Sequence, residues 1–210
     1  MLENEVFDKL EKLFPNQIND IERKALKQAY KDIEHNWETN CPPKRTEIKY
    51  LLICEAPPAN GKYFYSGIKT NLLTTVWKTF FDDSPKDINK AYHCFAKIGF
   101  LLVDTLPYAM NYNGHRNNPE YYELIVSCLD WWIKKLNNNF TFSDDLKIAF
   151  GFNNNALNVI IALNSKICLN QNKNKKFHTI CPNCISATSA GQPSRNKLKS
   201  IFNSPQMTCP

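Results

Sequence analysis

The sequence contains no run of about 18 consecutive apolar residues, the length that a helix needs to cross a bilayer. Its first residues, LENEVFDKLEK, are acidic and amphipathic, whereas a secretory signal peptide begins with basic residues and continues with apolar ones. No internal repeat occurs, which excludes repeat architectures. We therefore expect a cytoplasmic protein that does not associate with membranes.

The chain has 210 residues, of which 43% are hydrophobic, so it can bury a full core without disulfides. Eight cysteines are present, and Cys54, Cys94 and Cys128 lie within apolar periodic segments, which favours reduced, buried thiols. The net charge of +6 permits a polyanionic partner such as DNA, although proteins that bind no nucleic acid often carry a similar excess. We expect one domain, residues 1–210, in a monomer.

Strand and helix patterns alternate after two N-terminal helices. Apolar residues at helical spacing predict helices over residues 2–13 and 21–37, and we expect residues 1–40 to form a cover over a core at 48–200. Alternating elements favour a parallel sheet covered on both faces, and hence a three-layer α/β/α sandwich with a four-stranded parallel central sheet. The predicted strands are residues 48–54, 100–104, 146–150 and 185–188, and the later helices are 68–81, 85–98, 118–136, 156–163 and one after residue 195.

Polar residues follow the ends of several predicted strands. Glu55 comes directly after the first strand, Asp104 ends the second, and the loop at 189–195 follows the fourth. The carboxyl ends of parallel strands share one edge of a sheet, where open α/β sheets bind ligands. The Pro57-Pro58 pair stiffens the chain after Glu55, because proline fixes φ and has no amide donor. We therefore expect Glu55 to be held out at a functional edge.

The order of these motifs resembles the uracil-DNA glycosylase superfamily, and most of all the branch whose first motif reads GEAPG. The matches span about residues 48–200 and occur in the order of the family. They are CEAPP at 54–58, YFYSG at 63–67 in place of an aromatic P-F-V-G-like segment, Asp104 in place of a strand-ending Asn, GHRNNP at 114–119 in place of a G-N-R-x-P turn, and QPS at 192–194 in place of HPS.

The resemblance implies a DNA glycosylase, a monofunctional hydrolase that flips uracil or another deaminated base out of single- or double-stranded DNA and cleaves its N-glycosidic bond with water and no cofactor. It implies catalytic roles for Glu55 and Gln192, and base binding by Phe64, Asp104 and Ala56. It also implies contacts with DNA phosphates. The residues in these positions are Pro57, Ser66, Gly67, Ser194, Arg195 and Lys197.

Two positions depart from the family pattern. An ionised Asp104 only accepts hydrogen bonds, whereas Asn also donates, so the carboxylate would repel the uracil carbonyl that it should recognise. Gln192 can donate to a leaving base but lacks the ring and the possible charge of His. These departures leave open a second hypothesis, a catalytically weak or inactive nucleic-acid or nucleotide-binding protein of the same fold.

The GEAPG branch commonly carries an iron–sulfur cluster on four cysteines. Here Tyr108 stands near one ligand position and no cysteine pair precedes the first strand, so we expect no cluster. Cys181 and Cys184 have zinc or redox spacing, and His178 and Cys168 would complete four ligands. A single CxxC is more often adventitious, so we expect no metal, and a metal-binding module remains a third hypothesis.

Each functional assignment also has a purely structural alternative. Exposed carboxylates such as Glu55 usually pair with a cation or cap a loop. Phe64, between two tyrosines, is equally suited to a core or lid position. His115 and Arg116 are typical of a surface turn, although a basic loop at that edge could also follow DNA, and Gln192 can simply bond to the backbone.

Overall fold

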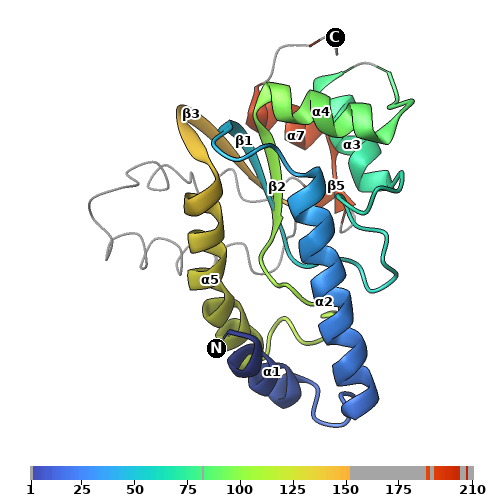
Figure 1. The fold of residues 1–210 in the computed structure, drawn as a ribbon, viewed down its shortest axis with the longest axis vertical. Coiled ribbons are helices and arrows are strands. Elements are labelled where there is room, and N and C mark those ends of the chain that lie inside the picture. The colour runs from blue at the N-terminus through green and yellow to red at the C-terminus, as the bar shows by residue number, and fades with distance from the viewer. Residues whose placement is uncertain (1, 82, 152–187, 190–191, 204–206, 208–210) are drawn as a thin grey trace.

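The computed structural model describes residues 2–81, 83–151, 188–189, 192–203 and 207 (Figure 1). Within these ranges the chain is mixed α/β, with an open parallel sheet of three strands flanked by helices. The strands are β1 (Glu47–Cys54), β2 (Phe100–Asp104) and β3 (Thr141–Phe150), in the order β2-β1-β3.

The strand order places the ends of all three strands at one edge. Cys54 aligns with Asp104, and Ile53 aligns with Phe150, in parallel register. The chain runs from β1 to β2 on one side and then crosses to β3 on the other side of β1. The direction of winding therefore changes between β1 and β3, and open α/β sheets bind ligands at such a switch point.

Three of the four predicted strands are confirmed. β1 and β2 match their predicted bounds within one residue, while β3 begins at Thr141 rather than at residue 146, with an irregularity of register between Ile48 and Tyr50. The fourth predicted strand, 185–188, lies almost wholly outside the described residues. Its last residue belongs to β4 (Thr188–Ser189), which pairs antiparallel with β5 (Gln192–Pro193) in a separate sheet.

The helices are capped by local side chains, and these caps set their starts. α3 (Asn71–Phe80) begins after Thr70, whose Oγ1 accepts from the Leu73 amide, and α4 (Ile88–Ile98) begins after Asp87, which accepts from the Lys90 amide. The predicted starts at residues 68 and 85 are therefore wrong by one turn or less. The other helices are α1 (Leu2–Leu13), α2 (Asp20–Asn40), α5 (Pro119–Asn139) and α7 (Arg195–Phe202).

The helices form two groups (Figure 1). α3 packs on α7, α7 lies against β3 and α4 against β2, whereas α1 packs on α5. α2 and α5 are joined by an ion pair between Glu34 and Lys135. No helix in the described ranges is long and apolar enough to span a membrane. The predicted helix 156–163 lies outside the described residues. The aromatic core under the first group includes Tyr50, Phe80, Phe95, Phe100 and Phe202.

β2 is the outermost strand on one side of the described sheet. At its middle, two side chains form hydrogen bonds with the backbone of Leu102. The amide of Leu102 donates to Tyr65 Oη at 3.2 Å, and Trp37 Nε1 donates to the carbonyl of Leu102 at 3.5 Å. Trp37 belongs to α2, so this bond fixes α2 beside the carboxyl end of β2. The same end carries Asp104.

The cysteines agree with the sequence prediction at two of three positions. Cys54 and Cys128 are buried free thiols, and burial raises the pKa of Cys128 to about 12. Cys94 is also buried but is disulfide-bonded, so the prediction of a reduced thiol there is wrong. Its partner lies outside the described residues.

Candidate functional site

Glu55 lies immediately beyond β1, and three donors meet its carboxylate. Arg116 Nε donates to Oε1 at 2.7 Å, Arg116 Nη2 donates to Oε2 at 2.5 Å, and the Tyr121 hydroxyl donates to Oε1. The Glu55 side chain is 15% exposed, so this two-point ion pair is shielded from solvent. The bond to Glu55 raises the pKa of Arg116 despite partial burial.

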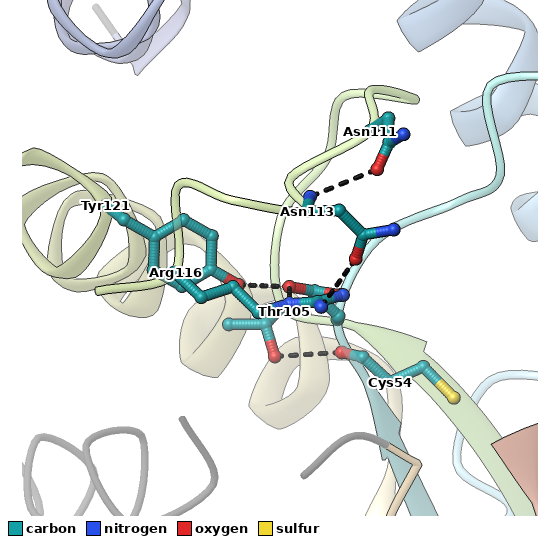
Figure 2. Close-up of polar contacts among 7 residues, drawn as sticks. Cys54, Thr105, Asn111, Asn113, Arg116 and Tyr121 are labelled. Atoms are coloured by element: carbon teal, nitrogen blue, oxygen red, sulfur yellow. Dashed lines mark hydrogen bonds and ion pairs between the residues drawn. The ribbon is translucent and has the colours of Figure 1, made fainter. Parts of the chain in front are cut away.

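The Arg116 side chain is held by the turn that carries it. Gly114 adopts a φ of +84°, a left-handed conformation that glycine takes without a Cβ penalty. Asn113 Oδ1 accepts from Arg116 Nη1 at 2.6 Å, and the Asn113 amide donates to Asn111 Oδ1 at 3.0 Å (Figure 2). Tyr121 follows in the first turn of α5, so one short segment supplies all three donors to Glu55.

The backbone of Glu55 is tied to the chain that follows β2. The amide and Oγ1 of Thr105 donate to the carbonyl of Cys54 at 2.8 and 2.9 Å, and the Leu106 amide donates to the carbonyl of Glu55 at 2.8 Å. Parallel pairing thus continues past the last residue of each strand. Thr105 is 2% exposed, and both its donors are satisfied. The position of Glu55 is therefore fixed on both backbone and side chain.

A glycine lets the QPS segment close against the same edge. Gly151 follows β3, and its amide donates to the carbonyl of Ile53 at 2.7 Å. A Cβ at this position would lie 2.6 Å from Cys54 Sγ and 3.6 Å from Pro193 Cγ. Pro193 therefore lies beside Gly151, at the ends of β1 and β3.

A small pocket of about 30 Å³ lies between α2, α5 and the end of β2. The carboxyl group of Asp104 has no hydrogen-bond partner among the described residues. Burial raises its pKa to about 7, with smaller contributions from Glu34 and Glu55, while Lys135 opposes the rise. Ala56, next to the buried Pro57, is half-buried. The pocket is lined chiefly by Trp37, Pro57, Asp104, Trp131, Trp132 and Lys135.

Lys135 bridges α5 and α2 at this pocket. Its Nζ lies 2.7 Å from both carboxylate oxygens of Glu34, 3.8 Å from the ring centroid of Trp37 and 4.9 Å from that of Trp131. Burial lowers the pKa of Lys135, and the Glu34 carboxylate opposes this. The two opposite charges largely cancel, so the pocket presents no strong net charge.

Trp132, which helps to line the pocket, carries an enclosed and unsatisfied donor. The residue is 2% exposed, and its buried Nε1 atom has no hydrogen-bond partner among the described residues. Buried N–H groups are nearly always paired in native proteins, because an unpaired donor loses its bond to water without replacement. The residues that line the pocket therefore include Asp104 and Trp132, and the indole donor of Trp132 is itself enclosed.

Phe64 occupies the core rather than the sheet edge. It is 2% exposed, and its ring packs against Tyr65, Tyr92, Phe95 and Phe100. Phe100 begins β2, whereas Asp104 ends it, so Phe64 lies toward the opposite end of that strand. In this position the ring is covered and does not offer a face to a base beside Asp104. A core position, the structural alternative to base binding, therefore accounts for where Phe64 lies.

The donors of the YFYSG segment are used within the protein. Ser66 Oγ donates to the carbonyl of Tyr63 at 2.7 Å. The Gly67 amide donates to Tyr92 Oη at 3.2 Å, with a φ of +74° at the glycine. Ser66 therefore closes its own turn, and Gly67 is tied to Tyr92 of α4.

The predicted phosphate-binding residues near the C-terminus lie at the start of α7. Ser194 is the N-cap residue but makes no side-chain capping bond, and Lys197 is exposed. Arg195 Nε donates to the carbonyl of Lys78 at 2.7 Å, which attaches α7 to α3. The described part of the chain holds no group of three or more His, Cys, Asp or Glu side chains placed to bind a metal. The predicted ligands Cys168, His178, Cys181 and Cys184 lie outside it.

No role at the site was predicted for Tyr121, Trp132 or Lys135, and Arg116 was predicted only as part of a surface turn or of a loop that follows DNA. The one available indication was the position of Arg116 between a glycine turn and a helix that begins with proline. Comparison of the chain with protein-family models, curated proteins and solved structures found no match. Its function is therefore argued from the residues at the site.

Proposed function

We propose that this protein is a DNA glycosylase that hydrolyses the N-glycosidic bond of uracil or another deaminated base. The proposal includes the four-stranded, three-layer fold of that superfamily and a monomeric enzyme. The observation that carries it is the place of Glu55, a shielded carboxylate fixed by Arg116 and Tyr121 at the switch-point edge of a parallel sheet.

A fixed carboxylate suits this reaction because positive charge develops on the sugar as the base departs. Water attacks the anomeric carbon, the bond from that carbon to the base nitrogen breaks, and its electron pair leaves with the base. The proton of the water passes to the carboxylate, the base nitrogen takes up a proton from solvent, and the carboxylate then returns its proton to solvent. A carboxylate has about four acceptor sites, and the three donors to Glu55 leave one for the attacking water.

DNA as the partner is supported by the net charge of +6 and by the order of the sequence motifs. The position of Pro193 beside Gly151 gives further support, because the proposal needs Gln192 near the bond that breaks. In this proposal the flat indole and proline side chains that line the pocket contact the base. The family resemblance implied this role for Phe64.

The Glu55 carboxylate already accepts hydrogen bonds from three donors, and this favours a second candidate function. Arg116 and Tyr121 already satisfy most of the carboxylate, as in a purely structural ion pair, and Phe64 is buried. The second candidate is a protein of the same fold that binds nucleic acid or nucleotides without cleaving them.

The test uses labelled single- and double-stranded oligonucleotides that carry uracil, hypoxanthine or xanthine, followed by alkaline cleavage of abasic sites. The first candidate predicts strand breaks with wild type, and a loss of about 100-fold or more in Glu55→Gln with binding retained. Glu123→Gln, an exposed carboxamide control, should cleave like wild type. Binding without cleavage of any lesion supports the second candidate, and absence of both binding and cleavage contradicts both.

A further inference from the structure

We propose that Phe14, directly after α1, is a positioning residue for the Glu55 carboxylate. It acts through Tyr112 and His115, which belong to the segment between β2 and α5. The same segment and the first turn of α5 supply the donors to Glu55. The effect of Phe14 on base excision rests on the proposed function, whereas its effect on the geometry of Glu55 does not.

The turn that carries Arg116 is largely polar and exposed. Residues 113–114 and 117–118 are exposed, and Gly114 has a left-handed backbone. Exposed polar turns open locally at a low free-energy cost, because opening them uncovers little apolar surface. The ion pair between Arg116 and Glu55 therefore needs an apolar contact that holds the turn closed.

Phe14 provides an apolar contact of this kind. Its ring centroid lies 4.5 Å from that of His115, the residue before Arg116, and 5.9 Å from that of Tyr112. Phe14 and Tyr112 are both buried. The buried Nδ1 atom of His115 has no hydrogen-bond partner among the described residues, so packing rather than a bond at this nitrogen holds the imidazole.

Tyr112 links Phe14 to the second side chain that donates to Glu55. The ring of Tyr112 lies 5.7 Å from that of Tyr121 at an interplanar angle of 67°, an edge-to-face contact between two buried rings. The Tyr121 hydroxyl reaches Glu55 only while its ring keeps this orientation. Phe14 is thus connected to both Arg116 and Tyr121.

The position of Phe14 is set by α1. The Phe14 amide donates to the carbonyl of Leu10 at 2.9 Å, which extends the last turn of the helix. α1 packs on α5, and an ion pair between Glu11 and Arg23 attaches it to α2. A displacement of α1 would therefore withdraw Phe14 from the turn and loosen the donors of Glu55.

The test measures how fast the Nε–H of Arg116 exchanges with water, by NMR of protein that contains ¹⁵N-labelled arginine. The chain has four arginines, and Arg116→Lys and Arg195→Lys each remove and thereby assign one resonance. Arg195 is the internal reference, because its Nε donates to the carbonyl of Lys78 and attaches α7 to α3, away from α1.

We expect Phe14→Ala to accelerate exchange at Arg116 about tenfold or more, while the rate at Arg195 stays within about twofold of wild type. Equal acceleration at both arginines would show that Phe14 contributes only to global stability. No acceleration at Arg116 would show that Phe14 does not hold the turn. Either result overturns the proposal.

Two variants of Tyr112 separate the aromatic contact from the hydroxyl. Tyr112→Phe keeps the ring and loses the bond from its hydroxyl to the carbonyl of Tyr108, so exchange at Arg116 should stay within about twofold of wild type. Tyr112→Leu removes the ring between Phe14 and Tyr121 and should resemble Phe14→Ala. Slow, wild-type exchange in Tyr112→Leu would contradict the proposed link.

Phe95→Ala is the matched control for loss of a buried ring. Phe95 lies on α4 in the aromatic core, and its removal should change the rates at Arg116 and Arg195 by the same factor. Selective acceleration at Arg116 in this variant would mean that any core cavity loosens the turn, which would overturn the specific role of Phe14.

Excision assays separate this inference from the proposed function. Phe14→Ala should lower kcat about tenfold and leave KM within about twofold, because a loosened Glu55 impairs attack more than binding. Faster exchange at Arg116 without excision by any of the proteins retains the positioning contact and removes the enzyme. Excision at the wild-type rate by Phe14→Ala retains the enzyme and removes Phe14 from its mechanism.

Discussion

Arg116 and Glu55, which are 61 positions apart in the sequence, form a two-point ion pair at the carboxyl edge of the sheet. The planar fork of arginine matches the two carboxylate oxygens, and a lysine cannot reproduce that match. We therefore expect Arg116→Lys to lower the free energy of unfolding by roughly 1–3 kcal/mol in urea melts. It should also slow any base excision about tenfold or more. Arg45→Lys, on an exposed loop, should behave like wild type, and an unchanged midpoint in Arg116→Lys contradicts the assignment.

Tyr121 shares its acceptor with Arg116. Tyr121→Phe removes only the hydroxyl that donates to Glu55 Oε1 and should cost about 1–2 kcal/mol of stability. Because both donors serve one carboxylate, the double variant with Arg116→Lys should not show the sum of the two single effects. A double-mutant cycle from chemical melts measures the coupling. Strict additivity would show that the two contacts act independently.

Asp104 makes stability depend on pH. The pKa of its carboxyl is 3.8 ordinarily and about 7 in the folded protein, so the folded state binds more protons between these values. The contribution of Asp104 to stability is therefore full below about pH 4, falls as the pH rises to about 7, and then stays constant. Asp104→Asn should gain stability over wild type progressively through that window, by roughly 1–4 kcal/mol at pH 8. The measurement is urea unfolding from pH 4 to 8, and a difference that does not vary with pH refutes the shift.

Gly151 is required because a side chain at this position has no room, and not because the backbone adopts a left-handed conformation there. A Cβ there would lie 2.6 Å from Cys54 Sγ, so Gly151→Ala should cost about 1–3 kcal/mol through overpacking. Removing the sulfur makes room, and the double variant Gly151→Ala with Cys54→Ala should be less destabilised than the two single changes together. Thermal melts of the four proteins test this. A tolerated Gly151→Ala would mean that Gly151 does not approach the Cys54 sulfur this closely.

The disulfide bond of Cys94 can be tested by counting reactive thiols. In denaturant without reductant, Cys94→Ala should expose one more reactive thiol than wild type, because the substitution frees the partner. Thiol titration measures the difference. One thiol fewer in the variant would mean that Cys94 is reduced, as the sequence analysis expected.

The sequence identified the elements whose residue pattern is decided locally. β1 and β2 are continuous apolar runs that end in Cys54-Glu55 and in Asp104, so both their bounds and their carboxylates were predicted. The first half of β3, TFSDD, is largely polar and lacks a clear period, so its start was missed. The starts of α3 and α4 depend on which side chain accepts an amide, and several polar residues were equally suitable.

The site depended on contacts between distant segments, and these were not visible in the sequence. Glu55 was placed at the edge, but its partners are set by the turn around Gly114 and by the crossing of α5. Phe64 was ambiguous because an aromatic residue between two tyrosines suits a core and a binding platform equally. Trp132 lies on an apolar helix face, where nothing distinguishes a packed indole from one with an unused donor.

The contacts that Tyr65 and Trp37 make with Leu102 also bear on association. An open sheet normally offers the backbone of its outermost strand to a strand from another molecule. Here that backbone is already bonded to a phenol and an indole at its midpoint. The β2 side therefore resists extension by strand addition, which protects the protein from edge-to-edge aggregation on that side.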